Sequence, residues 1–238
     1  NKSKLIYAVT PLGLLTLSAC GGGSSSSDSD TVTYDANGNV IKGLLSNALV
    51  GLDFDGDGTV DSSTVRTGTD GSYSISTTNS TYTIIATTDD TTIDTSSGAV
   101  LSGITLKAPK DASVVTPTTT LIEEADLTPD QVASVLGLPD GVDPLAFNPF
   151  ADGVDAADAL AVEKISQQII SVVTSFASAA EGAGASEADA FSSALQGLVE
   201  VVKDKAANLS VFGWKKEAVP ILQRKNSLIT KIFRRIFE

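Results

Sequence analysis

A strand signal and a turn signal follow each other directly in Leu49-Val50-Gly51-Leu52-Asp53-Phe54-Asp55-Gly56-Asp57-Gly58-Thr59-Val60-Asp61. Val50, Leu52 and Phe54 stand two residues apart, so their side chains share one face of an extended strand. The aspartates and glycines that follow favour a turn, and glycine permits a sharp bend. The stretch therefore predicts a core strand that ends in a tight acidic loop.

The same alternation recurs on both sides of this stretch, over residues 31–116. Short runs of β-branched and aromatic residues are separated by turn signals about every ten residues. Tyr73 and Tyr82 fall on the apolar positions of such runs, which predicts that both belong to the core. About seven short strands of this kind predict a small antiparallel β-sandwich, with a barrel as the alternative.

Helical patterns replace strand patterns in residues 117–212, so we expect an α+β chain with strands and helices in separate segments. Thr128-Pro129-Asp130-Gln131 reads as a capping box and predicts a helix that ends near Gly137. Residues 138–150 are rich in proline and glycine and predict a loop, in which we expect Phe147 and Phe150 to be buried.

Two long helices are expected after this loop. Asp155 opens the first, which runs to about Ala180, and Ser186 caps the second. The residues expected to face inward are apolar and recur at helical spacing. They are Ala157, Ala161, Ile165, Ile169, Val172, Val173 and Phe176 on the first helix, and Phe191, Leu195, Leu198, Val202 and Leu209 on the second.

The composition of the 238-residue chain excludes several kinds of chemistry. It contains no histidine and one cysteine, which rules out Ser-His-Asp and Cys-His catalysis, zinc sites of the His/Cys type and an internal disulfide. Glu123 and Glu124 adjoin, and neighbours on a helix point about 100° apart, so they do not form a facing acid–base pair. The net charge of −13 argues against a nucleic-acid partner. We expect no enzymatic activity.

The acidic loop has most of the spacing of a calcium-binding loop. With Asp53 as position 1, carboxylates stand at positions 1, 3, 5 and 9 and a glycine stands at position 6. Position 12 is Thr64, where an EF-hand has glutamate, and the flanks are strand-like, so this is not an EF-hand. The candidate ligands are Asp53, Asp55, Asp57, Asp61 and the backbone carbonyl of Thr59, with Asp70 as a further possibility.

We expect this loop to bind Ca²⁺ weakly, with a dissociation constant of about 10⁻⁴–10⁻³ M, as in extracellular modules. The alternative is a solvated acidic turn between two strands.

The N-terminal segment has the three parts of a secretory signal. Residues 1–19 begin with a basic stretch, continue with an apolar run too short to span about 30 Å of hydrocarbon, and end in small residues. Leu17-Ser18-Ala19-Cys20 resembles the bacterial lipobox, which implies that Cys20 is lipidated. Gly21 after the cysteine implies the outer membrane by the same resemblance. An ordinary signal peptide that happens to carry a cysteine is the alternative. Residues 20–30 form a Gly/Ser/Asp linker.

Three features between residues 43 and 75 carry a resemblance to a known family. They are an entry with Gly43, Ala48 and Val50, the acidic loop Asp53–Asp61, and the closing run Thr69-Asp70-Gly71-Ser72-Tyr73-Ser74-Ile75. The segment resembles the prealbumin-like B-type repeats of serine-aspartate adhesins. The resemblance implies a prealbumin-like sandwich, Ca²⁺ in the loop, and a role as a stiff spacer or adhesive stalk.

The C-terminal segment, residues 213–238, differs from the rest of the chain. Acidic residues outnumber basic ones up to residue 202, and the balance then reverses. Apolar pairs such as Ile232/Phe233 and Ile236/Phe237 recur every four residues, with cations opposite. Three interpretations stay open: an interfacial helix on anionic lipid, a helix packed on the helical region, or a frameshifted or truncated end. The chain also has no methionine, an indication that it is a fragment.

These features lead us to expect a non-enzymatic lipoprotein of the cell envelope, held in the outer membrane by lipid at Cys20 and facing the surface or the periplasm. Its work would be adhesion, spacing or assembly. The alternative is a surface or periplasmic binding subunit for a carbohydrate or an exported protein. Exposed aromatic side chains usually mark a glycan site, whereas Tyr73 and Tyr82 are expected in the core.

Overall fold

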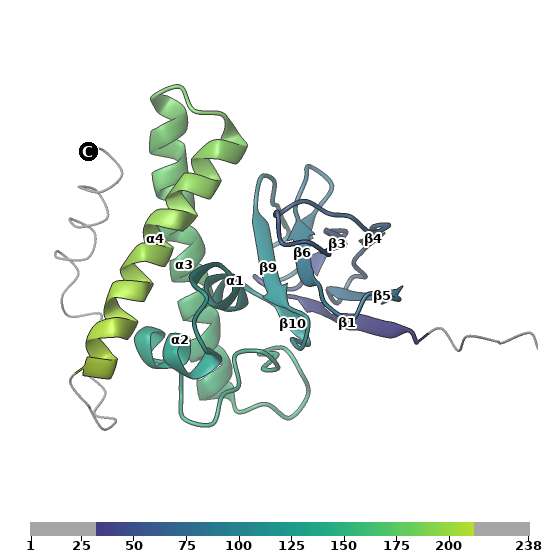
Figure 1. Cartoon of the computed structure of the whole chain (residues 1–238), viewed down its shortest axis with the longest axis horizontal. Coiled ribbons are helices and arrows are strands. Elements are labelled where there is room, and N and C mark those ends of the chain that lie inside the picture. The colour runs from purple at the N-terminus through teal and green to yellow at the C-terminus, as the bar shows by residue number, and fades with distance from the viewer. Residues whose placement is uncertain (1–31, 212–238) are drawn as a thin grey trace, which may run out of the picture. The chain divides into compact units, whose positions relative to one another are not determined.

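The computed structural model describes residues 32–211, in which ten strands precede four helices along the chain (Figure 1). The strands are β1 (Tyr34–Val40), β2 (Leu45–Ser46), β3 (Leu49–Asp53), β4 (Val65–Arg66), β5 (Ser72–Thr77), β6 (Thr83–Thr87), β7 (Ile93–Asp94), β8 (Ala99–Val100), β9 (Thr105–Pro109) and β10 (Val114–Val115). The helices are α1 (Pro117–Ala125), α2 (Pro129–Leu136), α3 (Ala156–Gly182) and α4 (Glu187–Val211). The predicted α+β organisation is confirmed. Cys20, the linker and the basic C-terminal segment lie outside the described residues.

The strands form three small sheets, with the orders β10-β1-β5, β2-β7-β8 and β4-β3-β6-β9. Every pairing is antiparallel except that of β1 with β10, which is parallel. The prediction of a wholly antiparallel arrangement is therefore wrong at this pair. A close backbone approach permits it: a Cβ atom added to Gly38 would lie 2.2 Å from the carbonyl oxygen of Ser113, so only glycine fits beside β10.

The sheets β10-β1-β5 and β4-β3-β6-β9 both contribute side chains to one apolar core. The buried residues include Ala36, Val40, Val50, Leu52, Tyr73, Ile75, Ile84, Ala86, Leu106 and Ala108. Tyr73 and Tyr82 are both buried, as the alternation predicts. The core residues of β3 are therefore fixed in place where the strand enters the acidic loop.

Helix α1 covers the outer edge of the four-stranded sheet at β9. The hydroxyl of Thr119 donates to the carbonyl of Lys107 (2.8 Å), and the N–H of Lys107 donates to Oγ1 of Thr120 (2.9 Å). An edge strand exposes unpaired backbone groups, and these two threonines satisfy both groups of Lys107. The strands and the helices are thus joined by buried polar contacts as well as by apolar packing.

The helix caps match the prediction. Thr128 and Gln131 form a capping box at the start of α2, which ends at a left-handed Gly137. Asp155 accepts hydrogen bonds from the N–H groups of Ala157 and Asp158 at the start of α3. These local signals need only a few neighbouring residues, which explains why the sequence reveals them.

Helices α3 and α4 lie side by side and bury most of the residues expected to face inward (Figure 1). Ala157 and Leu209 are exceptions and are exposed. Leu209 is exposed because the buried stripe of α4 passes through Val202 and Ala206. Phe150 is also exposed, where the side chain of Asn148 caps its N–H in a turn. Among residues 32–211, no helix is both long enough and apolar enough to cross a membrane.

Candidate metal centre

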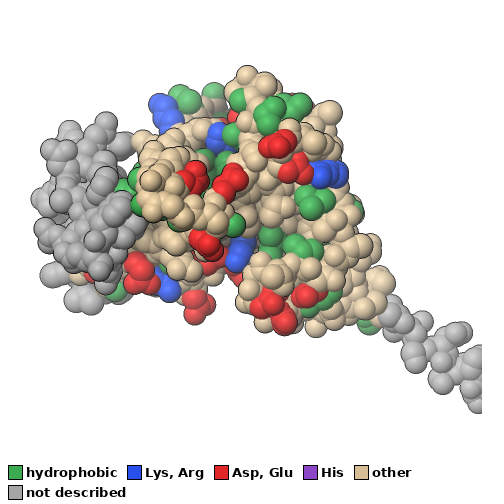
Figure 2. Space-filling model, turned by 90° about the horizontal axis from the view of Figure 1, so that it is seen from above, with side chains coloured by type: hydrophobic (Ala, Val, Ile, Leu, Met, Phe, Trp, Pro, Cys, Tyr) green, Lys and Arg blue, Asp and Glu red, His purple; other side chains and the backbone are tan. Residues whose placement is uncertain are grey.

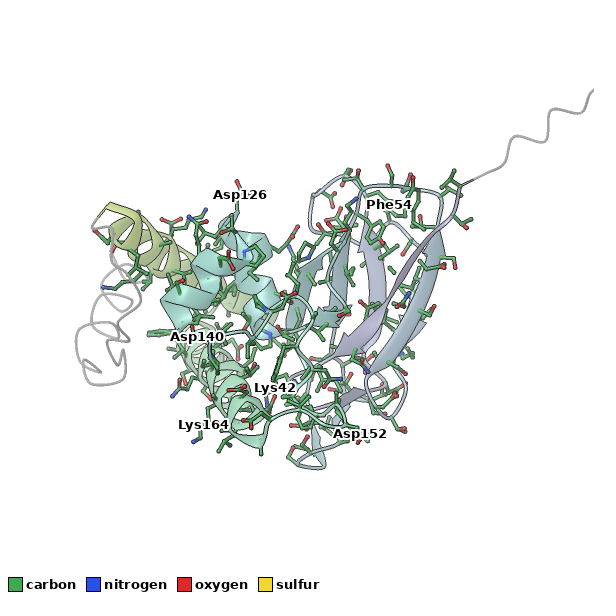
Figure 3. The ribbon with its side chains drawn as sticks, turned by 90° about the horizontal axis from the view of Figure 1, so that it is seen from below. Lys42, Phe54, Asp126, Asp140, Asp152 and Lys164 are labelled. Atoms are coloured by element: carbon green, nitrogen blue, oxygen red, sulfur yellow. The ribbon has the colours of Figure 1, made fainter. Side chains whose placement is uncertain are left out.

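The loop between β3 and β4 is closed at its base by hydrogen bonds to the backbone of Leu52. Asp61 and Ser62 both donate their N–H groups to the Leu52 carbonyl (2.9 and 3.2 Å). The N–H of Leu52 in turn donates to the hydroxyl of Ser62 (2.8 Å). Phe54, labelled in Figure 3, is half-buried against the core, and the exposed part of the loop begins after it, at Asp55. The two ends of the loop are therefore held together by the protein itself.

Asp53 sets the path of the loop from inside. It is only 2% exposed, and its Oδ1 accepts from the N–H groups of Asp55 (3.2 Å) and Gly56 (2.7 Å). Its Oδ2 accepts from the N–H of Gly58 (2.8 Å). Gly56 and Gly58 have φ angles of +80° and +87°, a region that side chains disfavour. The chain can therefore wrap around this carboxylate because glycine stands at both positions.

Three carboxylates converge in this loop. Asp53, Asp55 and Asp61 each offer one oxygen, and the three oxygens lie within 4.8 Å of one another. Like charges about 4 Å apart repel by about 1 kcal/mol per pair in bulk water and by about 4 kcal/mol near a protein surface. Asp61 is also anchored, because its Oδ2 accepts from the N–H of Phe54 (2.8 Å). This arrangement could hold a metal ion.

The carboxylate of Asp57, a predicted ligand, is not among the three that converge in the described part of the chain, although its N–H donates to Oδ1 of Asp55 (3.2 Å). Oδ1 of Asp57 accepts from both the N–H (2.7 Å) and the hydroxyl of Thr59. These two hydrogen bonds hold the pKa of Asp57 below its usual value, and the one from the hydroxyl has the larger effect. Thr64, at position 12 of the loop, lies back against β3, where its methyl group faces Gly51.

Asp70, the additional candidate, lies in the turn that leads into β5. Its Oδ1 accepts from the N–H of Ser72 (3.1 Å), and its backbone carbonyl accepts from the side chain of Asn39 (3.0 Å). Hydrogen bonds from the side chain and the backbone of Ser72 hold the pKa of Asp70 below its usual value. In the described part of the chain, Asp70 is not among the converging carboxylates.

Lys107 lies beside the acidic loop, a position that the sequence around it does not predict. Lys107 of β9 places its Nζ 3.4 Å from the position that a Cβ atom would take at Gly58. The same Nζ forms an ion pair with Glu124 of α1 (2.7 Å), while Glu123 accepts from the hydroxyl of Thr83 (2.6 Å). Lys107 therefore supplies positive charge between the acidic loop and α1. The two adjacent glutamates have different partners, as expected for helical neighbours.

Acidic side chains predominate over basic ones on the face that Figure 2 presents.

Comparison of the chain with models of protein families, with curated proteins and with solved structures finds no match.

Proposed function

We propose that residues 53–61 bind Ca²⁺ and that the ion stiffens the strand-rich part of a non-enzymatic, lipid-anchored protein of the cell surface. The observation that carries this proposal is the convergence of Asp53, Asp55 and Asp61 in a loop that is already closed at its base. We also propose that the strand-rich part is a prealbumin-like sandwich. Its role is adhesion, spacing or assembly.

The loop suits Ca²⁺ better than Mg²⁺. Ca²⁺ accepts six to eight oxygen ligands in flexible geometry, whereas Mg²⁺ demands a near-ideal octahedron. Each carboxylate oxygen can accept two hydrogen bonds, so Oδ2 of Asp53, which accepts one from Gly58, keeps capacity for a cation. Water and the carbonyl of Thr59 are the proposed sources of the remaining oxygens, and a rotation of Asp57 would add another.

The lipid anchor rests on the sequence Leu17-Ser18-Ala19-Cys20. Acyl chains contribute about 0.8 kcal/mol per buried methylene group, so two or more chains attach a protein stably where one does not. The Gly/Ser/Asp linker behind Cys20 has the composition of a flexible coil, which would let the strand-rich part stand off the lipid surface.

The test uses cells that produce the full chain, with Cys20→Ser and Asp55→Asn variants and with Asp152→Asn as a matched control away from the loop. We expect a palmitate analogue to label the unchanged chain and to leave Cys20→Ser unlabelled. We expect cell adhesion to fall with a calcium chelator and with Asp55→Asn, and to be unchanged by Asp152→Asn.

Failure to label the unchanged chain would contradict the lipid anchor. If neither the chelator nor Asp55→Asn changes cell adhesion, a role for the acidic loop in adhesion is contradicted. Specific binding on a glycan array without Ca²⁺-dependent adhesion would favour the carbohydrate-binding alternative.

A further inference from the structure

Strand β5 is an edge of the sheet β10-β1-β5, and no strand in the described part of the chain extends the sheet beyond it (Figure 1). The other sheet edges are short or covered. Strands β2, β4, β8 and β10 have two residues each, and α1 covers β9. Because β5 has six residues, it is the longest strand with an open edge among residues 32–211.

The hydrogen bonds of β1 show which backbone groups of β5 point to this open edge. The N–H of Asn39 donates to the carbonyl of Ser113 (3.1 Å), on the side of β1 that faces β10. Asn39 lies opposite Ser72, which is therefore at a non-hydrogen-bonded position of the β1–β5 pair. Such positions alternate along a strand, so Ser74 and Ser76 are of the same kind. All three serines direct their N–H and C=O groups away from β1.

The outward groups of Ser74 and Ser76 are free, whereas those of Ser72 are not. The carbonyl of Ser72 accepts from the N–H of Gly68 (2.8 Å), and its N–H donates to Oδ1 of Asp70 (3.1 Å). In the described part of the chain, no other segment forms a hydrogen bond with the outward backbone groups of Ser74 and Ser76. The open edge therefore presents two donors and two acceptors in a row.

Strand β5 also lacks the features that usually keep an edge strand from pairing. Native edges are protected by charged side chains, proline, bulges or a covering element. The sequence Ser72-Tyr73-Ser74-Ile75-Ser76-Thr77 has no charge and no proline, and it pairs with β1 over all six residues without a bulge. Tyr73 and Ile75 are buried, and the three serines are exposed. Such a strand is a template for another strand.

We propose that β5 pairs antiparallel with β5 of a second copy of this chain, about a two-fold axis at Ile75. In this register Ser74 of each copy lies opposite Ser76 of the other. The two donors and two acceptors of one edge then meet those of the other in four hydrogen bonds. A register centred on Ser74 would instead place Ser76 opposite Ser72, whose groups are already bonded.

A second copy fits this edge in charge and in side-chain pattern. The exposed row across the joined sheet consists of Asp35 and Ser76 of one copy, then Ser74 and Asn37 of the other, so it holds one charge. On the opposite face Ile75 meets Ile75 of the second copy, which continues the apolar core across the junction. The contact uses one strand from each copy, so it belongs to the small, weak class of interfaces.

The net charge of −13 makes two copies repel each other at long range. Salt screens this repulsion and leaves the backbone hydrogen bonds in place, so we expect pairing to be stronger at high salt than at low salt.

Analytical ultracentrifugation of the full chain at rising concentration tests the proposal, in a Cys20→Ser background without lipid. We expect a monomer–dimer equilibrium that shifts toward the dimer at high salt. Ser74→Pro removes an outward N–H and breaks no bond to β1. Two of the four hydrogen bonds between the copies are then lost, so the dissociation constant should rise about thirtyfold. Ser74→Thr keeps the N–H and is the matched control, which should dimerise like the unchanged chain.

Two cysteine variants in the same background test the register. Residues that face each other in a hydrogen-bonded pair have Cα atoms about 5.5 Å apart, a separation that a disulfide spans. A mixture of Ser74→Cys with Ser76→Cys should therefore form a disulfide-linked dimer under mild oxidation. Either variant alone places its thiols on a diagonal of about 7–8 Å and should link much less.

Thermal unfolding checks that each variant is folded. A chain that stays monomeric up to about 1 mM would overturn the proposal and would leave the open edge to an extended segment of another protein. Undiminished dimerisation of folded Ser74→Pro would also overturn it, because another surface would then join the copies. Linking of Ser74→Cys to itself as readily as to Ser76→Cys would overturn the register.

Discussion

The carboxylate of Asp53 stabilises its loop before any ion is bound. It accepts three backbone N–H groups while almost fully buried, whereas Asp57 is exposed and its carboxylate accepts from Thr59, two residues further on. Asp53 and Asp57 therefore have different structural roles, although they belong to the same motif. One belongs to the structure of the loop, and the other is available to solvent.

We predict that Asp53→Ala lowers the free energy of unfolding by about 3 kcal/mol in the presence of a chelator. The reason is that the backbone donors of Asp55, Gly56 and Gly58 lose a charged acceptor, and a hydrogen bond to a charged group contributes about 1.5–3 kcal/mol. Asp57→Ala, at an exposed position, should change the same quantity by about 0.5 kcal/mol or less. Urea denaturation of both variants measures the difference, and equal losses would contradict the structural role of Asp53.

At the scale of elements, the junction of β9 with α1 combines capping with edge protection. Thr119 belongs to the capping box of α1, since the N–H of Thr116 donates to its hydroxyl (2.8 Å), and that hydroxyl also donates to Lys107. Thr118, next to it, is equally buried, and its hydroxyl has no hydrogen-bond partner among the described residues. Adjacent threonines on one helix thus contribute to stability in opposite ways.

Valine substitutions at these two positions test this difference. Thr119→Val should lower the free energy of unfolding by about 2 kcal/mol, because it leaves the N–H of Thr116 without its acceptor and leaves the carbonyl of Lys107 with only the longer contact from the hydroxyl of Thr120 (3.3 Å). Thr118→Val should leave it unchanged or raise it, because a buried hydroxyl without a partner is replaced by a methyl group of similar size. Thermal unfolding of the two variants decides. A larger loss of unfolding free energy for Thr118→Val than for Thr119→Val would contradict these roles of the two hydroxyl groups.

At the scale of the whole molecule, the acidic loop is linked to the helices through Lys107, which lies beside Gly58 and pairs with Glu124. A second group of charges, the ion pair of Lys42 with Asp94 and the nearby Glu163 of α3, lies where α3 meets the strands. Both sets of charges connect the strand-rich part to the helices. Binding in the loop should therefore stabilise the described fold as a unit and not the loop alone.

We predict that Ca²⁺ raises the melting temperature of the full chain. At a concentration about ten times the dissociation constant, binding to the folded state alone adds about 1.4 kcal/mol. For a chain of this size, that corresponds to a rise of about 3–6 °C. Chelator should reverse the rise, and Asp55→Asn should abolish it, because it removes one of the three converging carboxylates. Calorimetric titration with no heat at millimolar Ca²⁺, together with an unchanged melting temperature, would contradict the metal site.

The sequence alone determined the features that depend on a few neighbouring residues. The caps at Thr128 and Asp155, the core strand with Val50 and Leu52, and the acidic loop after it all follow from local periodicity and side-chain chemistry. Within that loop, the spacing of the aspartates predicted a metal site, and three of the predicted carboxylates do converge.

Only the tertiary structure decided which distant residues meet. The parallel pairing of β1 with β10, the position of Lys107 beside the loop, and the meeting of Lys42, Asp94 and Glu163 depend on strand register and on how the helices pack. Local patterns carry no information on such contacts, because a periodic strand or helix can pack its apolar face against several partners. The free energy that selects one arrangement comes from the assembled core.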